Sequence, residues 1–122
     1  MKRYFLIDMD GVLYHGDSVL EGATRFVSRI PLSRRLFVTN NPIRSPREIA
    51  AHFASIGLPV PPTSRILTSA LAAAAWLAAR KPGFRYFAVG DTGLHEALAV
   101  HGIEDPEHAD FVVVGEGPGL DF

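Results

Sequence analysis

The chain contains no cysteine among its 122 residues. A disulfide framework, a thiol nucleophile and a thiolate zinc site are therefore excluded within this sequence. Long apolar runs are also missing, because the longest, residues 70–79, is too short and too rich in alanine to cross a bilayer. Asp8 interrupts the apolar run that follows Lys2 and Arg3 before a signal-peptide core can form. We expect no membrane segment and a cytoplasmic location.

An excess of charge of one sign is missing as well. The 12 Lys and Arg residues nearly balance the 13 Asp and Glu residues, which gives a formal net charge of −1. Nucleic-acid binding needs a basic face, so this composition argues against a nucleic-acid partner. Hydrophobic residues make up 48% of the chain, which is typical of a globular protein with one modest domain or one and a half small ones.

Apolar and helical patterns alternate along the chain. The sequence predicts strands at residues 4–8, 34–41, 65–69, 84–89 and 109–114. Helices are expected between them, over residues 21–30, from Ser45-Pro46 to a cap at Gly57, over 70–80, and from Thr92. Phe26 and Trp76 are expected to point into the core. This alternation favours βαβ units and therefore an α/β fold with a parallel, partly Rossmann-like sheet.

Two carboxylates stand where the first strand ends. Asp8 and Asp10 follow the apolar run Tyr4-Phe5-Leu6-Ile7, and Gly11 then allows a sharp change of direction. Residues at i and i+2 of a strand share a face, so both acids should converge just beyond its carboxyl end, where open α/β sheets bind ligands. Like charges this close are costly unless a cation lies between them or one acid stays protonated, and a hard, oxygen-ligated cation such as Mg²⁺ is the simplest explanation.

The pattern also suggests a chemistry. Asp8 can serve as a nucleophile that forms an aspartyl-phosphate, and Asp10 can act as general acid and then general base. Thr39, Asn40 and Asn41 follow the next strand and can donate hydrogen bonds to phosphoryl oxygens. Taken alone, these three residues are equally typical of a strand end with local turn-forming hydrogen bonds.

Asp8-Met9-Asp10-Gly11-Val12-Leu13-Tyr14 resembles the first motif of the haloacid dehalogenase (HAD) superfamily, and Thr39-Asn40-Asn41 resembles its second. Further matches narrow the resemblance to the NagD and p-nitrophenylphosphatase-like branch: Gly22-Ala23, Gly57, Thr68-Ser69-Ala70, Val89-Gly90 and Val112-Val113-Val114-Gly115. The resemblance implies a Mg²⁺-dependent phosphatase for a small phosphorylated metabolite, with Asp8 and Asp10 at the metal and Gly11, Thr39, Asn40 and Asn41 around the phosphate. It also implies that residues 1–83 are the first half of the phosphatase core and residues 84–122 the start of an inserted α/β cap, with Lys81-Pro82-Gly83 at the boundary.

The family's third motif, a lysine, and its fourth, an acidic cluster, have no clear counterpart here. Lys81 and Val89-Gly90-Asp91 match them superficially, but the next acid is Glu96 and the cap interpretation fits better. The resemblance therefore implies a catalytically incomplete portion of a phosphatase. A non-catalytic Mg²⁺- or phosphate-binding half-domain is the alternative; a receiver-like phospho-acceptor is less favoured, because receivers carry these acids on different strands. An unpaired first strand would favour a homodimer through this edge or through the unfinished cap.

Overall fold

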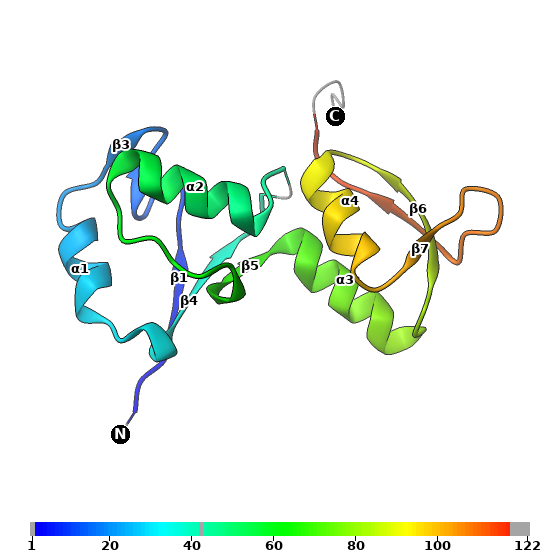
Figure 1. Cartoon of the computed structure of the whole chain (residues 1–122), viewed down its shortest axis with the longest axis horizontal. Helices are drawn as coiled ribbons and strands as arrows, with labels where there is room; N and C mark the ends of the chain where they lie inside the picture. The colour runs from blue at the N-terminus through cyan, green and yellow to red at the C-terminus, as the bar shows by residue number, and fades with distance from the viewer. Residues whose placement is uncertain (1, 42, 118–122) are drawn as a thin grey trace. The chain divides into compact units, whose positions relative to one another are not determined.

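The computed structural model describes residues 2–41 and 43–117, and the chain divides into two compact units. The first comprises the residues up to Thr39 together with Pro46–Leu67, and the second comprises the remainder. Figure 1 shows strands and helices alternating along the chain in both units. The predicted α/β class with parallel sheets is confirmed. The predicted domain boundary at residue 83 stays a prediction. The division into compact units is a different one, in which the chain passes from the first unit to the second for the last time between Leu67 and Thr68.

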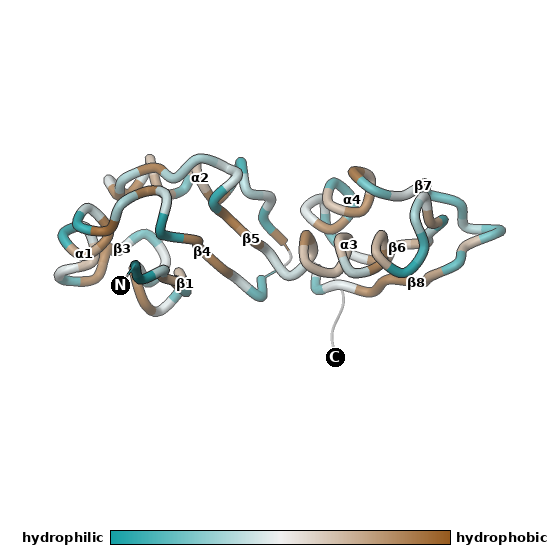
Figure 2. The backbone as a smooth tube through the Cα atoms, turned by 90° about the horizontal axis from the view of Figure 1, so that it is seen from below, coloured by the Kyte–Doolittle hydropathy of each residue, from teal (hydrophilic) through white to brown (hydrophobic). Residues whose placement is uncertain are grey.

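The first unit is built on a three-stranded sheet in the order β1-β4-β5. Its strands and helices are β1 (Phe5–Asp8), β4 (Arg35–Thr39), β5 (Ile66–Thr68, whose last residue belongs to the second unit), α1 (Ala23–Arg29) and α2 (Pro46–Ile56). β1 and β4 are parallel, with Ile7 beside Phe37. These two residues form the core with side chains of both helices: Val27, Ile49 and Phe53. Hydrophobic colour marks the middle of β4 and β5 in Figure 2.

The second face of this sheet is not covered to the same extent. Strand residues alternate between faces, so Leu6 and its register partner Leu36 point away from the core that holds Ile7 and Phe37. Leu6 is 74% exposed, Tyr4 is 72% exposed, and Leu67 on β5 is also exposed. Within the described residues β1 pairs only with β4, so it is an edge strand.

The second unit repeats the pattern with a sheet in the order β7-β6-β8. Its elements are α3 (Ser69–Arg80), β6 (Arg85–Val89), α4 (Thr92–Ala99), β7 (Ile103–Glu104) and β8 (Phe111–Val114). β6 runs parallel to both neighbours, and α3 packs against α4. The core joins one face of β6 to both helices through Ala74, Leu77, Tyr86, Ala88, Leu94 and Leu98.

Local sequence signals explain where the helices begin and end. Pro46 is the first residue of α2, and Gly57 follows it with a φ of 82°, a conformation that glycine adopts without strain. The Thr68 side chain caps α3 by accepting a hydrogen bond from the Leu71 amide at 3.1 Å. Asp91 caps α4 through a shorter contact, because its carboxylate accepts from the amide of the next residue, Thr92, at 2.7 Å. The remaining described elements are short: β2 (Tyr14–His15), β3 (Ser18–Val19) and two 3₁₀ turns (Leu32–Arg34 and Thr63–Arg65).

Two predictions about side-chain burial are wrong. Trp76 is 56% exposed, and the guanidinium of Arg80 lies over its ring at 3.9 Å. Ala70, Ala74 and Leu77 form the buried face of α3 instead. Phe26 is 48% exposed and makes an edge-on contact with Phe5 at 6.3 Å. No helix among residues 2–41 and 43–117 is both long and apolar enough to cross a membrane.

Asp110 makes the stability of the second unit sensitive to acid. The backbone N–H of Arg85 and the ammonium of Lys81 both donate to its carboxylate, at 2.8 and 2.5 Å, and they hold its pKa below the ordinary 3.8 although partial burial opposes them. Because the folded-state pKa is lowered, this stabilisation is fully present above the ordinary value and is lost as the pH falls through the folded-state value.

We therefore expect the melting temperature of the second unit to fall as the pH drops below about 4. Thermal unfolding followed by Trp76 fluorescence at a series of pH values measures this, since Trp76 is the chain's only tryptophan and lies on α3. The Asp110→Asn variant is less stable at neutral pH and its melting temperature depends less on pH in this range. An unchanged pH profile in that variant would contradict the assignment.

Candidate active site

The parallel pairing of β1 and β4 brings two predicted site residues to one edge of the sheet. Asp8 is the last residue of β1 and lies beside Val38 in the register. Thr39 follows Val38 and is the last residue of β4. Both strands run in the same direction, so Asp8 and Thr39 stand at the carboxyl edge, where open α/β sheets bind their ligands.

A tight turn follows Asp8 and carries Asp10. The carbonyl oxygen of Met9 accepts hydrogen bonds from the amides of Val12 and Leu13, at 3.1 and 2.8 Å. Gly11 has a φ of 81°, in the region that favours glycine, and its amide donates to Tyr14 at 2.8 Å. Met9 is 1% exposed and anchors the turn in the core. Asp8 and Asp10, on either side of it in the sequence, are both exposed.

The donor atoms of this turn fit a hard cation. Asp8 and Asp10 offer carboxylate oxygens, although one oxygen of Asp8 already accepts the Met9 amide at 2.8 Å. Among the described residues, no group of three or more His, Cys, Asp or Glu side chains comes together as a metal site. Mg²⁺ is commonly held by one or two carboxylates, with water and substrate phosphate as its other ligands. Two carboxylates beside an open edge therefore suit Mg²⁺ better than a cation that requires an all-protein cage.

Asn40 and Asn41, also predicted to line the site, belong to the second unit. The Asn40 carbonyl accepts a hydrogen bond from the Ser69 hydroxyl at 3.0 Å. The Asn41 side chain accepts from the Ile43 amide at 2.9 Å, which is the local turn bond that such residues commonly form. A role for either residue in the pocket of Asp8 stays a prediction.

A small hairpin after the acidic turn was missed by the sequence analysis. β2 and β3 pair antiparallel, and α2 anchors them through His52. The Nε2 of His52 donates to the carbonyl oxygen of Gly16 at 2.9 Å, and its ring contacts Tyr14 edge-on at 4.9 Å. The carbonyl oxygen of Tyr14 accepts a hydrogen bond from the Gly11 amide, so His52 supports the acidic turn indirectly, through Tyr14. A separation of 36 residues between His52 and Gly16 leaves no local sequence signal for this contact.

The two residues considered as substitutes for the missing motifs have structural roles. Lys81 forms an ion pair with Asp110 at 2.5 Å. Asp91 caps α4 by accepting a hydrogen bond from the amide of Thr92 at 2.7 Å. Both interactions lie within the second unit, whereas Asp8 and Asp10 belong to the first.

Gly11→Ala should separate the role of this turn from general backbone strain. An alanine at a φ of 81° costs about 1–2 kcal/mol, although no atom lies within 4 Å of the added carbon. Gly16→Ala is a matched control, because Gly16 also has a positive φ, 60°, and open space around it. We expect similar losses of stability in urea unfolding for both variants, but weaker Mg²⁺ binding only for Gly11→Ala. Equal Mg²⁺ binding by the two variants would contradict a role for this turn.

Comparison with known proteins identifies the family of the chain. The model of the haloacid dehalogenase-like hydrolases matches residues 5–104. An acid sugar phosphatase of Staphylococcus saprophyticus is 38% identical over 121 residues, which cover 94% of this chain and 46% of that protein. A homologue named acid sugar phosphatase from Staphylococcus aureus is 34% identical over the same length. The chain thus spans about half the length of these curated relatives.

Solved structures give the same result. A putative p-nitrophenyl phosphatase from Bacillus subtilis has a TM-score of 0.85 at 31% identity. The match covers 100% of this chain and 49% of the B. subtilis chain. NagD from Escherichia coli has a TM-score of 0.82 at 33% identity, with coverages of 100% and 50%. A glycerol phosphate phosphatase from Mycobacterium tuberculosis, solved with magnesium, has a TM-score of 0.83 at 34% identity, with coverages of 96% and 37%. The resemblance to the NagD and p-nitrophenylphosphatase branch is confirmed, and the chain belongs to the haloacid dehalogenase-like hydrolases.

Proposed function

We propose that this chain carries the nucleophilic part of a Mg²⁺-dependent phosphatase site. The observation that supports this most is the placement of Asp8 and Thr39 at one carboxyl edge of a parallel sheet, with Asp10 on the glycine turn beside it. A carboxylate oxygen of Asp8 attacks phosphorus, and the bond to the leaving oxygen breaks as Asp10 gives that oxygen a proton. Water then attacks the aspartyl-phosphate, Asp10 takes its proton, and phosphate and free Asp8 result.

The other side chains of the edge bind and orient the phosphoryl group. The Thr39 hydroxyl can donate to a phosphoryl oxygen, and Asn40 and Asn41 would contribute amide donors to the same group. A bound Mg²⁺ would supply positive charge that stabilises the negative charge on the phosphoryl group. Asp8 and Asp10 are the residues that would hold it.

We further propose that the chain alone does not complete this site. In the family it resembles, a lysine and an acidic cluster lie beyond the cap, and this chain spans 46% of the acid sugar phosphatase from S. saprophyticus. The substrate class we propose is a small phosphorylated metabolite, in line with relatives named for sugar phosphate and glycerol phosphate. A non-catalytic Mg²⁺- or phosphate-binding half-domain is the second candidate. It is favoured because Asp8 and Asp10 are exposed and no third acid joins them in the part of the chain that the structure describes.

A chimera distinguishes the two candidates. The chain is joined to the part of the S. saprophyticus acid sugar phosphatase that follows the matched region, and hydrolysis of p-nitrophenyl phosphate is measured with and without Mg²⁺. We expect Mg²⁺-dependent hydrolysis by the chimera and none by the isolated chain. A chimera that is folded by circular dichroism but inactive would favour the binding half-domain, and activity of the isolated chain would contradict the proposed incompleteness.

A further inference from the structure

Tyr14 links the acidic turn to the hairpin that follows it. Its carbonyl oxygen accepts the Gly11 amide at 2.8 Å, and it forms a β-bridge with Asp10. It is also the first residue of β2, where it pairs with Val19 of β3. Because one buried residue is bonded to both parts, a displacement of the hairpin is passed on to the turn that carries Asp10.

The helix α2 holds this hairpin at two points, and His52 takes part in both. The Nε2 of His52 lies 2.9 Å from the carbonyl oxygen of Gly16, in the loop between β2 and β3. Its ring contacts Tyr14 edge-on at 4.9 Å, and Phe53 contacts Tyr14 at 5.7 Å. The His52 side chain is only 11% exposed, so water competes little for these contacts.

The partner of His52 also decides which ring nitrogen carries a proton. A carbonyl oxygen can only accept a hydrogen bond, so the Nε2 that faces Gly16 is the donor. The other nitrogen, Nδ1, lies 3.9 Å from the carboxylate of Asp17, which is too far for a hydrogen bond. The hairpin is therefore held by one hydrogen bond with a defined donor, which a side chain without an N–H cannot replace.

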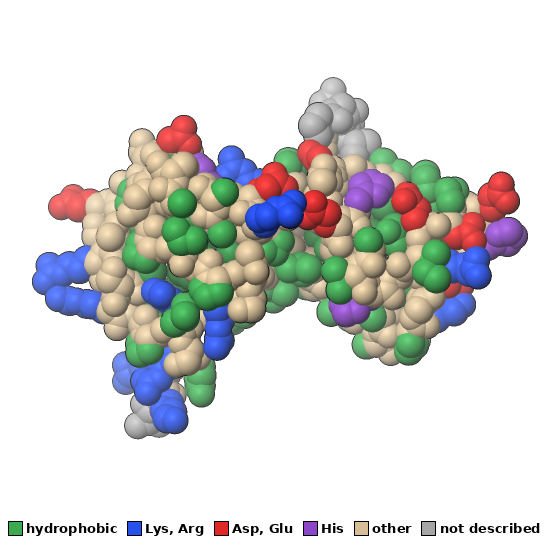
Figure 3. All heavy atoms as spheres, viewed as in Figure 1, with side chains coloured by type: hydrophobic (Ala, Val, Ile, Leu, Met, Phe, Trp, Pro, Cys, Tyr) green, Lys and Arg blue, Asp and Glu red, His purple; other side chains and the backbone are tan. Residues whose placement is uncertain are grey.

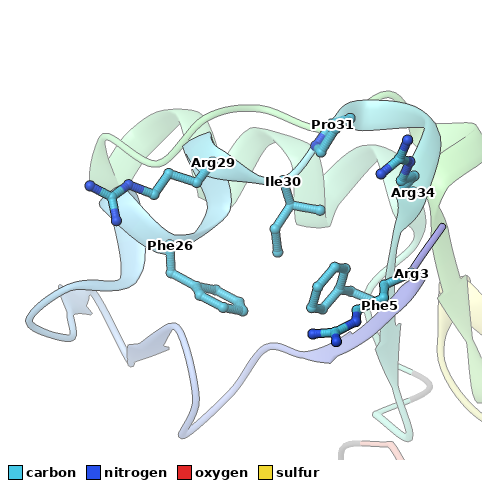
Figure 4. Close-up of a pocket in the computed structure, with 7 residues that line it drawn as sticks. All are labelled: Arg3, Phe5, Phe26, Arg29, Ile30, Pro31 and Arg34. Carbon is cyan, nitrogen blue, oxygen red and sulfur yellow. The ribbon is translucent and has the colours of Figure 1, made fainter. Parts of the chain in front are cut away.

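The opposite end of β1 is built differently. A hollow of about 440 Å³ lies there between β1 and α1, and the ring of Phe5 points into it (Figure 4). Lys and Arg side chains gather around this N-terminal end of the chain (Figure 3). No residue of the hairpin or of α2 lines the hollow. Side-chain packing against the acidic turn therefore comes from the other end of the strand, where the hairpin meets α2.

We propose that His52 is a positioning residue for the acidic turn. Its hydrogen bond to Gly16 fixes the hairpin, and the hairpin, through Tyr14, fixes Gly11 and Asp10. His52 itself contributes no ligand and no proton to the reaction. The consequence for Mg²⁺ rests on the proposed function, whereas the coupling between His52 and the turn does not.

Two substitutions separate the hydrogen bond of His52 from its ring. His52→Phe keeps an aromatic ring against Tyr14 but has no N–H, whereas His52→Gln loses the ring and keeps an amide that can donate to Gly16. The full chain is titrated with Mg²⁺ and followed by the amide chemical shifts of Met9 and Gly11. We expect the dissociation constant to rise about tenfold in His52→Phe, as is typical when an outer-shell contact is lost, and to stay close to the natural value in His52→Gln.

Ser55→Ala is the matched control on the same helix. The Ser55 hydroxyl donates to the carbonyl oxygen of His52 at 2.7 Å, so this change also removes a hydrogen bond, but one that stays within α2. The Mg²⁺ dissociation constant of this variant should equal that of the natural chain.

Hydrogen exchange of the Gly11 amide tests the coupling without a metal. This amide is bonded to Tyr14, so its exchange rate reports how firmly the turn is held. We expect faster exchange at Gly11 in His52→Phe than in the natural chain and in His52→Gln, with little change at the amide of Phe37 in β4. A role in stability alone would speed exchange at Phe37 to the same extent, because the whole unit would open more often.

Three results would overturn the proposal: unchanged exchange at Gly11 in His52→Phe, an equal change at Gly11 and Phe37, or an equal effect of His52→Phe and His52→Gln. Failure of the proposed function has a different signature, because the natural chain and Asp8→Asn would then respond to Mg²⁺ in the same way. The exchange rates would still decide the role of His52 in that case. If Asp8 is required for Mg²⁺ binding but His52→Phe binds as tightly as the natural chain, the proposed function stands and the positioning role fails.

Discussion

Asp8→Asn in the chimera with the S. saprophyticus acid sugar phosphatase is expected to lower the rate of p-nitrophenyl phosphate hydrolysis about a thousandfold or more. The amide has no negative charge to attack phosphorus, and it is a poorer ligand for Mg²⁺. The exchange is nearly isosteric, and Asp8 is exposed at the end of β1, so the fold should persist. Initial rates at saturating substrate and Mg²⁺ measure the effect.

Asp17→Asn provides the matched control. Asp17 lies between β2 and β3 in the same unit, and its side chain is 92% exposed. Its carboxylate is solvated and lies 3.9 Å from the Nδ1 of His52, which is too far for a hydrogen bond, so the pair contributes little. The control should keep the activity of the unmodified chimera within about twofold, because a contribution of this size shifts a rate little. A similar loss in both variants would show that Asp8 has no specific role.

Phe53→Ala is expected to destabilise the first unit by about 3–5 kcal/mol. Phe53 is fully buried on α2, and its ring makes edge-on contacts with Phe37 at 5.3 Å and Tyr14 at 5.7 Å. Its loss would leave a cavity between the helix and the sheet that holds Asp8. Because small domains are stable by about 5–15 kcal/mol, a loss of this size removes much of the unit's stability.

Urea unfolding followed by far-ultraviolet circular dichroism measures this change. The fluorescence of Trp76 reports the second unit separately, because the first unit contains no tryptophan. Phe26→Ala is the control, since Phe26 lies in the same unit but is 48% exposed, and it should cost markedly less. Equal losses for the two variants would mean that the core is not centred on Phe53.

Short-range chemistry made much of this fold predictable. A proline or glycine restricts or frees the backbone at its own position, so Pro46 and Gly57 marked the two ends of α2 correctly. Asp91 caps α4 through the amide of its neighbour Thr92, a contact that is equally local. The acidic turn was recognisable because its three functional features, Asp8, Asp10 and Gly11, occupy four consecutive positions.

Contacts between distant segments were not predictable in this way. Trp76 was expected in the core because it is large and apolar, but alanines form the side of α3 that fits closely against its neighbours, and Trp76 packs under Arg80 instead. His52 joins α2 to the hairpin after the acidic turn, but its partner Gly16 lies 36 residues away in the sequence. The assignment of α3 to the same unit as β6 likewise depends on long-range packing.

Titration of the chain with Mg²⁺, followed by amide proton and nitrogen chemical shifts, tests the central claim most directly. If Asp8 and Asp10 hold the cation, the amides of Met9 and Gly11 should shift and saturate in the natural chain and in Asp17→Asn. The Met9 amide reports on Asp8 directly, because it donates a hydrogen bond to that carboxylate. The same shifts should be absent in Asp8→Asn, because this change removes a carboxylate that holds the cation. Shifts of equal size in Asp8→Asn, or a response centred on Asp17, would contradict the assignment of this turn as the metal and phosphoryl site.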